Sequence, residues 1–217
     1  MTTPDSPLTV YGNPLSTCTR RVLFALREKG VPYELVAVDL RAGEHKSPEF
    51  LKLQPFGQIP VLQDGTFTLF ESRAICRYIE RKYRGHGTSL IPEGAKEAGI
   101  VDEWCSVEQA IFDPPCSGLV SELLFKKSRG LEHDPLRARV LVRQLEEVMD
   151  VYERHLSDGK EYLAGEFSLA DLFHAPYGVY LAPVGLLPIL TTPSRPHVKA
   201  WWERLVARKA WREVEET

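Results

Sequence analysis

Hydroxyl and thiol groups crowd one predicted junction between a loop and a helix. In "VYGNPLSTCTRRVLFALREKG", an apolar strand and a loop containing proline lead into a helix predicted over Thr19–Lys29, which Gly30 closes. The junction itself carries Ser16, Thr17, Cys18 and Thr19. Three chemistries are open there: a hydroxyl that caps the helix, a redox-active cysteine, or a hydroxyl that meets a substrate.

The segment "PFGQIPVL", residues 55–62, places a proline at the start of a predicted strand. Proline cannot donate to a central ladder, so Ile59-Pro60 predicts a sheet edge, a bulge or a cis peptide bond. There the backbone N–H and C=O of Ile59 could pair with an extended, peptide-like ligand, as an added strand would. The alternative is an ordinary loop before a hairpin.

The segment "FESRA", residues 70–74, is a second candidate for ligand binding. Ser72 lies at a predicted helix start, where free N–H groups and the helix dipole favour an anion. Glu71 beside it could pair with an ammonium group. Together they suit the carboxylate and amine of an amino acid. The alternative is a helix cap with an acidic first turn.

Other polar residues have simpler interpretations. His45 and Lys46 in "AGEHKSPEF" could bind a second carboxylate or belong to a solvated loop. "GEFSLADL" predicts a capping box with Ser168 at the cap and Asp171 three positions on. Asp171 and His174 are interpreted as a pair in the core, because the histidines make no metal-ligand spacing.

The first third of the chain alternates strands and helices. "PLTVYG" and "PYELVAVDL" flank the first helix, which predicts a β-α-β unit with parallel strands. Asp64-Gly65 between alternating apolar residues predicts a hairpin, and "ESRAICRYIERKY" predicts the next helix. We therefore expect an α/β domain over residues 1–84, with helices packed on a small mixed sheet.

Residues 85–94 are rich in Gly, Ser, Thr and Pro and predict a linker. After it, the pattern favours an all-α helical domain over residues 95–217. One helix face is marked by Leu141, Leu145, Val148, Tyr152 and Leu156. Residues 175–194 carry no charge, but their prolines and glycines favour a buried helix and loop over a membrane span.

Composition narrows the classes of function. A net charge of −3 predicts no strong attraction to nucleic acid or to an anionic membrane. The four cysteines form no Cys-x-x-Cys pair and fit no zinc module, which favours a reducing compartment without disulfides. The start, "MTTPDSPLTV", lacks the pattern of a secretory signal. We expect a cytoplasmic protein without a metal.

In combination, these motifs resemble the soluble glutathione transferases, most closely the phi class. The resemblance spans nearly all of the chain, and the order "PFGQIP…DG…LFESRAI" is its most specific part. Its carriers are "YGNPLSTCTRRVLFALREKG", "DLRAGEHK", "PFGQIPVLQDG", "LFESRAICRYI", "FDP" at residues 112–114, "GEFSLADL" and "RPHVKAWWERL". The resemblance implies a thioredoxin-like N-terminal domain, a helical C-terminal domain and a homodimer.

Glutathione, γ-Glu-Cys-Gly, has an amino-acid head, an extended peptide middle and a terminal carboxylate, which the three motifs would bind. By the resemblance, the γ-glutamyl head is bound by Glu71, Ser72 and Arg73. The cysteinyl unit is bound at Ile59 and Pro60. The glycine carboxylate lies toward His45, Lys46 and Gln58. The implied reactions are conjugation of glutathione to electrophilic hydrophobic compounds and reduction of organic hydroperoxides.

The resemblance also assigns the catalytic hydroxyl to Ser16. We expect Arg21 to support the loop that carries it. A hydrogen bond donated to the glutathione sulfur would favour the thiolate over the thiol. Thr17 is the rival hydroxyl. Cys18 is the rival catalyst, because relatives with a catalytic cysteine favour thiol–disulfide exchange. Since it lies two residues on, a helix turns it about 200° away, and burial as a small apolar residue is expected.

The second substrate is expected in an apolar cleft between the domains, with Leu15, Phe112, Tyr177 and Tyr180 as candidate walls. The two tyrosines could equally belong to the core. Two other functions stay open: a Cys18-dependent thiol transferase or dehydroascorbate reductase, and a non-catalytic carrier of hydrophobic ligands. Gln54 stands where many relatives have Asn and could alter the order of the glutathione loop.

Overall fold

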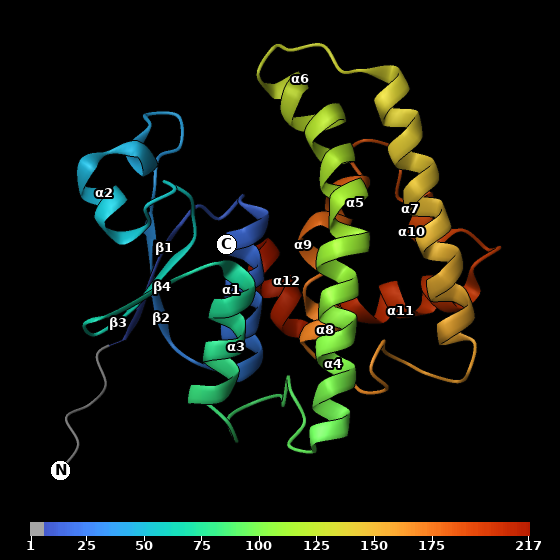
Figure 1. The fold of residues 1–217 in the computed structure, drawn as a ribbon, viewed down its shortest axis with the longest axis horizontal. Coiled ribbons are helices and arrows are strands. Elements are labelled where there is room, and N and C mark those ends of the chain that lie inside the picture. Colours follow the sequence, from blue (N-terminus) through green and yellow to red (C-terminus); the bar gives the residue numbers. More distant parts are fainter. Residues whose placement is uncertain (1–6) are drawn as a thin grey trace. The chain divides into compact units, whose positions relative to one another are not determined.

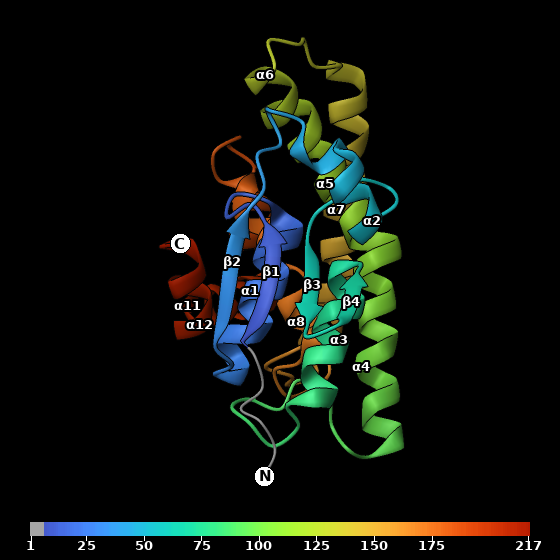
Figure 2. The same ribbon diagram turned by 90° about the vertical axis from the view of Figure 1, so that its left-hand side faces the viewer.

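A four-stranded sheet forms the centre of the first structural unit (Figures 1 and 2). The computed structural model describes residues 7–217, so most of the segment that argued against a secretory signal lies outside the described residues. The strands are β1 (Leu8–Gly12), β2 (Tyr33–Ala37), β3 (Val61–Asp64) and β4 (Phe67–Phe70), in the spatial order β2-β1-β3-β4.

The predicted local units of this sheet are confirmed. Strands β1 and β2 are parallel, and helix α1 (Thr17–Lys29) joins them. Gly30 ends α1 with a φ of 62°, and its N–H donates to the carbonyls of the last turn. Strands β3 and β4 form the expected hairpin, in which Asp64 lies opposite Phe67 and Gly65 has a φ of 59°. The predicted fold class, an α/β unit followed by helices, is therefore correct.

A short helical segment between β2 and β3 was not predicted. It consists of a 3₁₀ turn, η1 (Glu44–Lys46), and helix α2 (Pro48–Leu53). Ser47 is the N-cap of α2, and its hydroxyl accepts a hydrogen bond from the N–H of Phe50 at 3.2 Å. Pro48 follows at the first helical position. The pair Ser-Pro is a helix-start signal that "HKSPEF" contains but that the polar composition concealed.

Helices α3 (Ser72–Lys82) and α12 (Lys209–Glu215) both pack on α1. The ring of Trp211 in α12 lies 5.2 Å from that of Phe24, centroid to centroid, and both side chains are fully buried. The first unit therefore comprises the chain up to Ser89 together with residues 209–217, and the second comprises residues 90–208. This differs from the expected boundary, which placed the C-terminal helix in the helical domain.

A buried ion pair fastens the linker to the first unit. The Lys29 ammonium lies 2.8 Å from a carboxylate oxygen of Glu80 and donates at 3.0 Å to the carbonyl of Thr88. The Lys29 and Glu80 side chains are 0% and 1% exposed. Removing one partner of such a pair would leave the other charge buried without compensation, which costs about 3–5 kcal/mol.

The second unit is helical. Its elements are α4 (Ala95–Val107), η2 (Glu108–Phe112), α5 (Asp113–Val120), η3 (Ser121–Phe125), α6 (Lys126–Ser128), α7 (Pro135–Leu156), α8 (Leu169–Leu172), α9 (Ala175–Gly178), η4 (Val179–Leu181), α10 (Pro188–Thr191) and α11 (Pro196–Ala207). The apolar face predicted for α7 is buried from Leu145 onward. Among the described residues, no helix is long and apolar enough to cross a membrane.

The π-helical turn η2 has a local cause in the sequence. Pro114 and Pro115 follow Asp113 and have no N–H to donate to the carbonyls four residues earlier. The helix widens here, and the N–H of Asp113 donates five residues back, to Glu108. A second π turn, η3, follows α5.

The predicted capping box at α8 is confirmed. The Ser168 hydroxyl accepts from the first turn of α8, while the Asp171 carboxylate accepts from the N–H of Ser168. Asp171 also accepts from Leu163 N–H at 2.9 Å and from the Trp201 indole at 2.8 Å. Burial raises the pKa of Asp171 to about 6, although these hydrogen bonds act in the opposite direction and lower it.

His174 lies in the core beside Asp171, as predicted, and its backbone N–H donates to the carbonyl of Asp171 at 3.1 Å. One ring nitrogen lies 3.0 Å from the hydroxyl of Tyr152, and the other lies 2.7 Å from the carbonyl of Ala170. A neutral ring satisfies both bonds if it donates to Ala170 and accepts from Tyr152.

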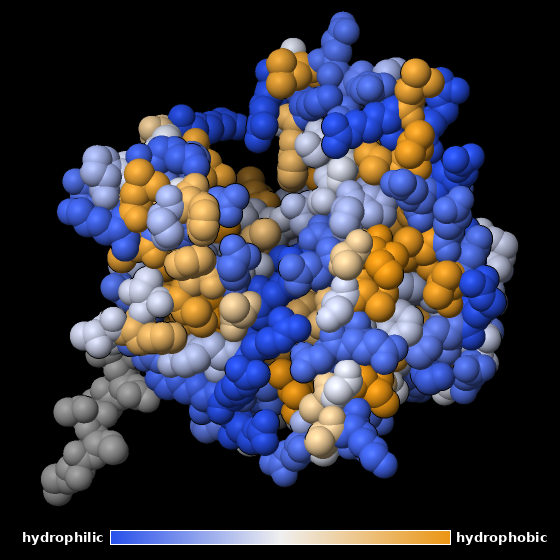
Figure 3. All heavy atoms as spheres, in the orientation of Figure 1, coloured by the Kyte–Doolittle hydropathy of each residue, from blue (hydrophilic) through white to orange (hydrophobic). Residues whose placement is uncertain are grey.

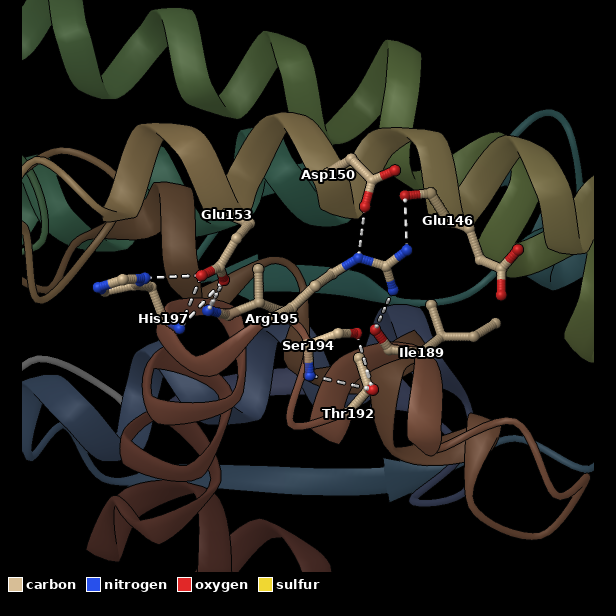
Figure 4. A network of polar contacts seen from close by, with 9 residues as sticks. Glu146, Asp150, Glu153, Ile189, Thr192, Ser194, Arg195 and His197 are labelled. Carbon is tan, nitrogen blue, oxygen red and sulfur yellow. Dashed lines mark hydrogen bonds and ion pairs between the residues drawn. The ribbon is translucent and has the colours of Figure 1, made fainter.

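The N-terminus of α11 is capped by a residue of α7 (Figure 4). Arg195, at the N-cap position, makes no side-chain cap. Instead, the Glu153 carboxylate accepts from the N–H groups of His197 and Val198, at 3.0 and 2.9 Å. Burial opposes the charge of Glu153, but these bonds outweigh it and hold its pKa below the usual range.

We predict that Glu153→Gln lowers the free energy of unfolding by about 1 kcal/mol at pH 7, the cost of a lost helix cap. Because the folded-state pKa is lowered, the stabilisation is present above the unfolded value of about 4.3 and is lost as pH falls through the folded pKa. Urea titrations of both proteins from pH 7 to 3 check this.

Glu147→Gln is the matched control, because that side chain is 70% exposed and, among residues 7–217, pairs only with Arg143 on its own helix. The cap interpretation would be contradicted if the control were equally destabilised, or if Glu153→Gln kept the acid dependence of the parent.

Candidate active site

The register of the sheet gathers the candidate segments at one edge. Tyr11 of β1 lies opposite Val61 of β3, and Val61 lies opposite Phe70 of β4. The end of β1, the start of β3 and the end of β4 therefore coincide. The loop to α1, the Ile59-Pro60 bend and the start of α3 all leave from this edge, toward which β1, β2 and β4 point in Figure 2.

Ser16 is the N-cap of α1 and is half-buried. Its hydroxyl oxygen accepts a hydrogen bond from the N–H of Thr19 at 3.3 Å. The hydrogen of the hydroxyl takes no part in that bond. Ser16 is therefore a helix cap that can also donate to another atom, so two of the three chemistries proposed for this junction are compatible.

The other two residues of the junction that carry hydroxyls are less exposed than Ser16. Thr17, the rival hydroxyl, is only 6% exposed. Thr19 is fully buried, and its hydroxyl oxygen accepts from the N–H of Asn13 at 3.2 Å. The backbone of Gly12 passes so close that a Cβ there would lie 2.6 Å from this oxygen. Thr19 therefore holds the loop in place.

A buried guanidinium links α1 to α3. Arg21 is 0% exposed, and it donates to the Ser72 hydroxyl at 2.8 Å. Ser72 is the first residue of α3 and makes no cap, so the interpretation of this serine as a helix cap was wrong. Because its oxygen accepts from Arg21, its own hydrogen can be donated to an anion at the helix N-terminus.

Glu71, at the N-cap position of α3, has a φ of 72° and an exposed side chain. A positive φ in a residue other than glycine is strained and is concentrated at functional sites. The strained backbone turns the chain from β4 into α3 and places Glu71 beside Ser72. Glu71 and Ser72 are neighbours in the chain, and the hypothesis that they bind an amino-acid head group stays a prediction.

The Ile59–Pro60 peptide bond is cis, as predicted. Within residues 7–217, neither backbone group of Ile59 has a hydrogen-bond partner. An extended ligand could therefore pair with them. This is the arrangement expected from the position of proline at the start of β3.

Hydrogen bonds to a buried side chain of the loop itself hold the loop before this bend in place. Gln54 is 1% exposed, and its side-chain oxygen accepts from the N–H groups of Phe56 at 2.6 Å and Gln58 at 3.3 Å. The Lys46 ammonium donates to the carbonyl of Phe56 at 2.9 Å. Sequence reasoning expected Gln54 to alter this loop; the structure shows that it organises the loop.

The predicted carboxylate-binding residues at η1 differ from one another. The Lys46 ammonium already donates to the Phe56 carbonyl, a contact that was not predicted from the sequence. His45 is half-buried, and its Nδ1 is buried without a hydrogen-bond partner among the described residues. Gln58 is exposed. Gly57 passes so close to His45 that a Cβ would lie 2.6 Å from its carbonyl oxygen, so the two loops touch.

Cys18 is half-buried rather than buried, contrary to expectation. Its sulfur lies 3.7 Å from a guanidinium nitrogen of Arg21. The other three cysteines are buried and free. Burial raises the pKa of Cys76 to about 12 and that of Cys116 well above its ordinary value, so neither thiol is suited to be a nucleophile.

The candidate walls of the apolar cleft are not equivalent. Leu15 is 67% exposed, and Tyr177 and Tyr180 are half-buried. Phe112 is 1% exposed and packs against His174, with ring centroids 4.4 Å apart. A wall needs an exposed face, so Phe112 belongs to the core of the helical unit. Among residues 7–217, no cluster of three His, Cys, Asp or Glu side chains could hold a metal.

Family models match both units of the chain. Residues 6–81 match the N-terminal domain of glutathione S-transferases, and residues 114–209 match their C-terminal domain. Glutathione S-transferase F10 of Arabidopsis thaliana is 45% identical over 95% of both chains. Glutathione S-transferase 3 of Zea mays is 47% identical over 96% of this chain and 93% of its own.

Solved structures agree with these matches. Glutathione transferase F7 from Populus trichocarpa has a TM-score of 0.92 and 46% identity, and the match covers 96% of this chain and 98% of the other. Maize glutathione S-transferase I, solved in complex with an atrazine glutathione conjugate, has a TM-score of 0.89 and 36% identity over 97% of both chains.

We predict that Gln54→Leu destabilises the protein by about 1–3 kcal/mol, because two amide groups lose their shared acceptor. Hydrogen exchange at the Phe56 and Gln58 amides should accelerate more than exchange in the strands. Gln58→Leu is the control, since that side chain is exposed. Equal exchange at these amides in parent and Gln54→Leu proteins would contradict an ordering role for Gln54.

Proposed function

Because this chain belongs to the glutathione S-transferase family, and its relatives are plant enzymes of the phi class, we propose that Ser16 activates glutathione in it. The chain is an enzyme of this family and uses glutathione as co-substrate. The proposal concerns the residues that bind and activate the tripeptide and the compounds that receive it.

The observation that carries the proposal is the Ser16 hydroxyl, which caps α1 and still has its hydrogen to donate. A donor at about 3 Å from the glutathione sulfur favours the thiolate. The N-terminus of α1 adds partial positive charge. A thiol has a pKa near 8.5, and each unit by which a site lowers it corresponds to about 1.4 kcal/mol.

The thiolate then attacks an electrophilic carbon of a hydrophobic compound. A carbon–sulfur bond forms, and the leaving group departs with the bonding electron pair. With an organic hydroperoxide, the thiolate attacks the terminal oxygen instead, the O–O bond breaks, and the alkoxide leaves and takes up a proton to become the alcohol. The glutathione sulfenic acid that remains reacts with a second glutathione, which releases water and forms the disulfide. We keep Leu15, Tyr177 and Tyr180 as the candidate residues for contact with the hydrophobic compound.

Three features support the proposed glutathione site. The Ser72 hydroxyl and the Glu71 carboxylate offer a donor and an acceptor for the γ-glutamyl head, with Arg73 next in the chain. The unpaired backbone of Ile59, before Pro60, suits the cysteinyl unit. His45 and Gln58 are available for the glycine carboxylate, whereas Lys46 would have to exchange the Phe56 carbonyl for it.

A specific observation favours testing Cys18 as an alternative catalyst. Cys18 is half-buried, and its sulfur lies 3.7 Å from a guanidinium nitrogen of Arg21. In that alternative the enzyme exchanges disulfides through Cys18. We place the protein in the cytoplasm, because its four cysteines are free and a reducing compartment keeps them so.

We predict that Ser16→Ala lowers the rate of glutathione conjugation to a chromogenic aryl halide by at least about tenfold at pH 7. The pH profile should shift toward that of free glutathione, since the thiolate loses its donor.

Cys18→Ala is the matched control and should retain the rate. The reverse pattern, in which Cys18→Ala is inactive and Ser16→Ala is not, would replace the proposal with the Cys18 alternative. If both variants kept the parent rate and profile, neither residue would be the activator.

We also propose a homodimer, and two complementary surfaces support it. Phe56 is 66% exposed at the tip of the loop that Gln54 orders. The helical unit carries a cavity of about 680 Å³ between α4 and α7. Its apolar lining includes Trp104, Val107, Ala110, Ile111, Val148 and Val151. Apolar residues gather over these helices in Figure 3. The partner subunit's Phe56 could fill this cavity.

We predict that Ile111→Glu, at a residue 49% exposed, converts the dimer to monomer in sedimentation velocity, because a charge would be buried without a partner. Leu136→Glu is the control, since Leu136 is 69% exposed on α7 but does not line the cavity. A monomeric parent, or an Ile111→Glu protein that stays dimeric, would contradict this assignment.

A further inference from the structure

The loop that leads from β1 into α1 contains a tight turn, residues 13–16. Asn13 and Pro14 occupy its first two positions, where asparagine and proline are favoured in type I turns. The N–H of Ser16 closes the turn by donating to the Asn13 carbonyl at 2.9 Å. The side-chain oxygen of Asn13 also accepts from the N–H of Leu15 at 3.0 Å. Two local hydrogen bonds therefore shape the backbone that carries Ser16.

A cationic side chain of α1 binds the same turn. The Nε of Arg20 donates to the carbonyl of Pro14 at 2.7 Å. Because the guanidinium is charged, this hydrogen bond is of the stronger, charge-assisted kind. The backbone N–H of Arg20 donates to the carbonyl of Ser16 at 2.9 Å, which begins the hydrogen bonding of the helix. One residue thus holds the chain both at Ser16 and two positions before it.

The two adjacent arginines of α1 have different partners. Successive residues of a helix point about 100° apart. Arg21 is fully buried and donates to Ser72 at the start of α3, whereas Arg20 is half-buried and donates to Pro14. Sequence reasoning expected Arg21 to support the loop of the catalytic hydroxyl. The hydrogen bond from α1 to the Pro14 carbonyl is made by its neighbour Arg20.

The position of the Ser16 hydroxyl depends on the backbone beneath it. Its oxygen accepts from the N–H of Thr19 at 3.3 Å, a long hydrogen bond that holds the side chain weakly. To stabilise a thiolate, the hydroxyl must donate over about 3 Å. A displacement of about 1 Å in an active site can lower a rate about a hundredfold. Whatever fixes the turn before Ser16 is therefore expected to affect the rate.

We propose that Arg20 is a positioning residue for glutathione conjugation. By holding the Pro14 carbonyl, its guanidinium fixes the turn that ends at Ser16, so that the hydroxyl can donate to the glutathione sulfur. Arg20 acts through the backbone and not by contact with glutathione. The inference rests on the proposed function of Ser16 and adds a residue to it.

The test compares three variants of the full-length protein. Arg20→Leu removes the donor to Pro14, and Arg20→Lys keeps a cationic donor. Arg27→Leu is the matched control, because it makes the same change on the same helix at a side chain that is 40% exposed and lies 3.7 Å from Glu213. The readouts are kcat, KM for glutathione and the pH profile of aryl halide conjugation, together with hydrogen exchange at the Ser16 amide without ligand. Urea midpoints show whether each variant is folded.

We expect Arg20→Leu to lower kcat at pH 7 by about tenfold, while KM for glutathione changes by less than about twofold. The pH profile should shift toward that of free glutathione, because a misplaced hydroxyl stabilises the thiolate less. Exchange at the Ser16 amide should accelerate about tenfold, since the turn opens more often. Arg20→Lys should recover most of kcat, and Arg27→Leu should match the parent in all of these measurements.

Three results would overturn the proposal. The first is a parent-like kcat and pH profile in Arg20→Leu, and the second is an equal loss in Arg27→Leu. The third is a double variant, Ser16→Ala with Arg20→Leu, whose loss is the product of the two single losses, because a residue that acts through Ser16 adds nothing once the hydroxyl is gone. Failure of the Ser16 proposal itself is distinguishable: Ser16→Ala would then keep the parent rate, while faster exchange at the Ser16 amide in Arg20→Leu would still show that Arg20 holds the turn.

Discussion

The buried guanidinium of Arg21 is the interaction on which the candidate active site depends. A charge that is fully withdrawn from water is costly unless hydrogen bonds satisfy it. Arg21 donates to Ser72 at the start of α3, and its own helix carries Ser16 at the N-cap. The constraint therefore fixes two helix N-termini relative to each other. It also explains why Ser72 cannot serve as a simple helix cap.

The loop with the cis peptide bond is also organised by a buried polar group that hydrogen bonds satisfy, in this case a neutral amide. Gln54 is withdrawn from water, and its oxygen organises the amides of Phe56 and Gln58. This one side chain presents a bare backbone at Ile59 and an exposed ring at Phe56. The proposed glutathione site and the proposed dimer contact thus depend on one buried amide. The first uses the backbone of Ile59, and the second uses the side chain of Phe56.

Local signals in the sequence were sufficient for much of this architecture. The parallel pair around α1, the Asp64-Gly65 hairpin, the capping box at Ser168 and the cis bond before Pro60 each depend on a few neighbouring residues. The resemblance to the family assigns the three ligand-binding motifs to three parts of one tripeptide, and this assignment stays a prediction.

Features set by distant contacts were beyond such reasoning. Phe112 lies in the core of the helical unit, where its ring packs against that of His174, far along the chain. The hydrogen bond from Lys46 to Phe56 joins residues ten apart through a turn that the sequence did not predict. The sequence of α12 likewise does not indicate that it packs on α1, since the pattern of an amphipathic helix shows which face is buried but not against which surface.

The packing of α12 on α1 has a consequence for the order in which the protein can be made. Residues 90–208 are in effect inserted between two parts of the first unit. During synthesis, the face of α1 that carries Phe24 is made before residues 90–208, whereas Trp211 is made only after them. The first unit therefore has an uncovered apolar face for as long as the helical unit is being translated. A ribosome that stalls before Trp211 would hold a chain with a complete sheet and an exposed aromatic surface, a species that is prone to aggregate.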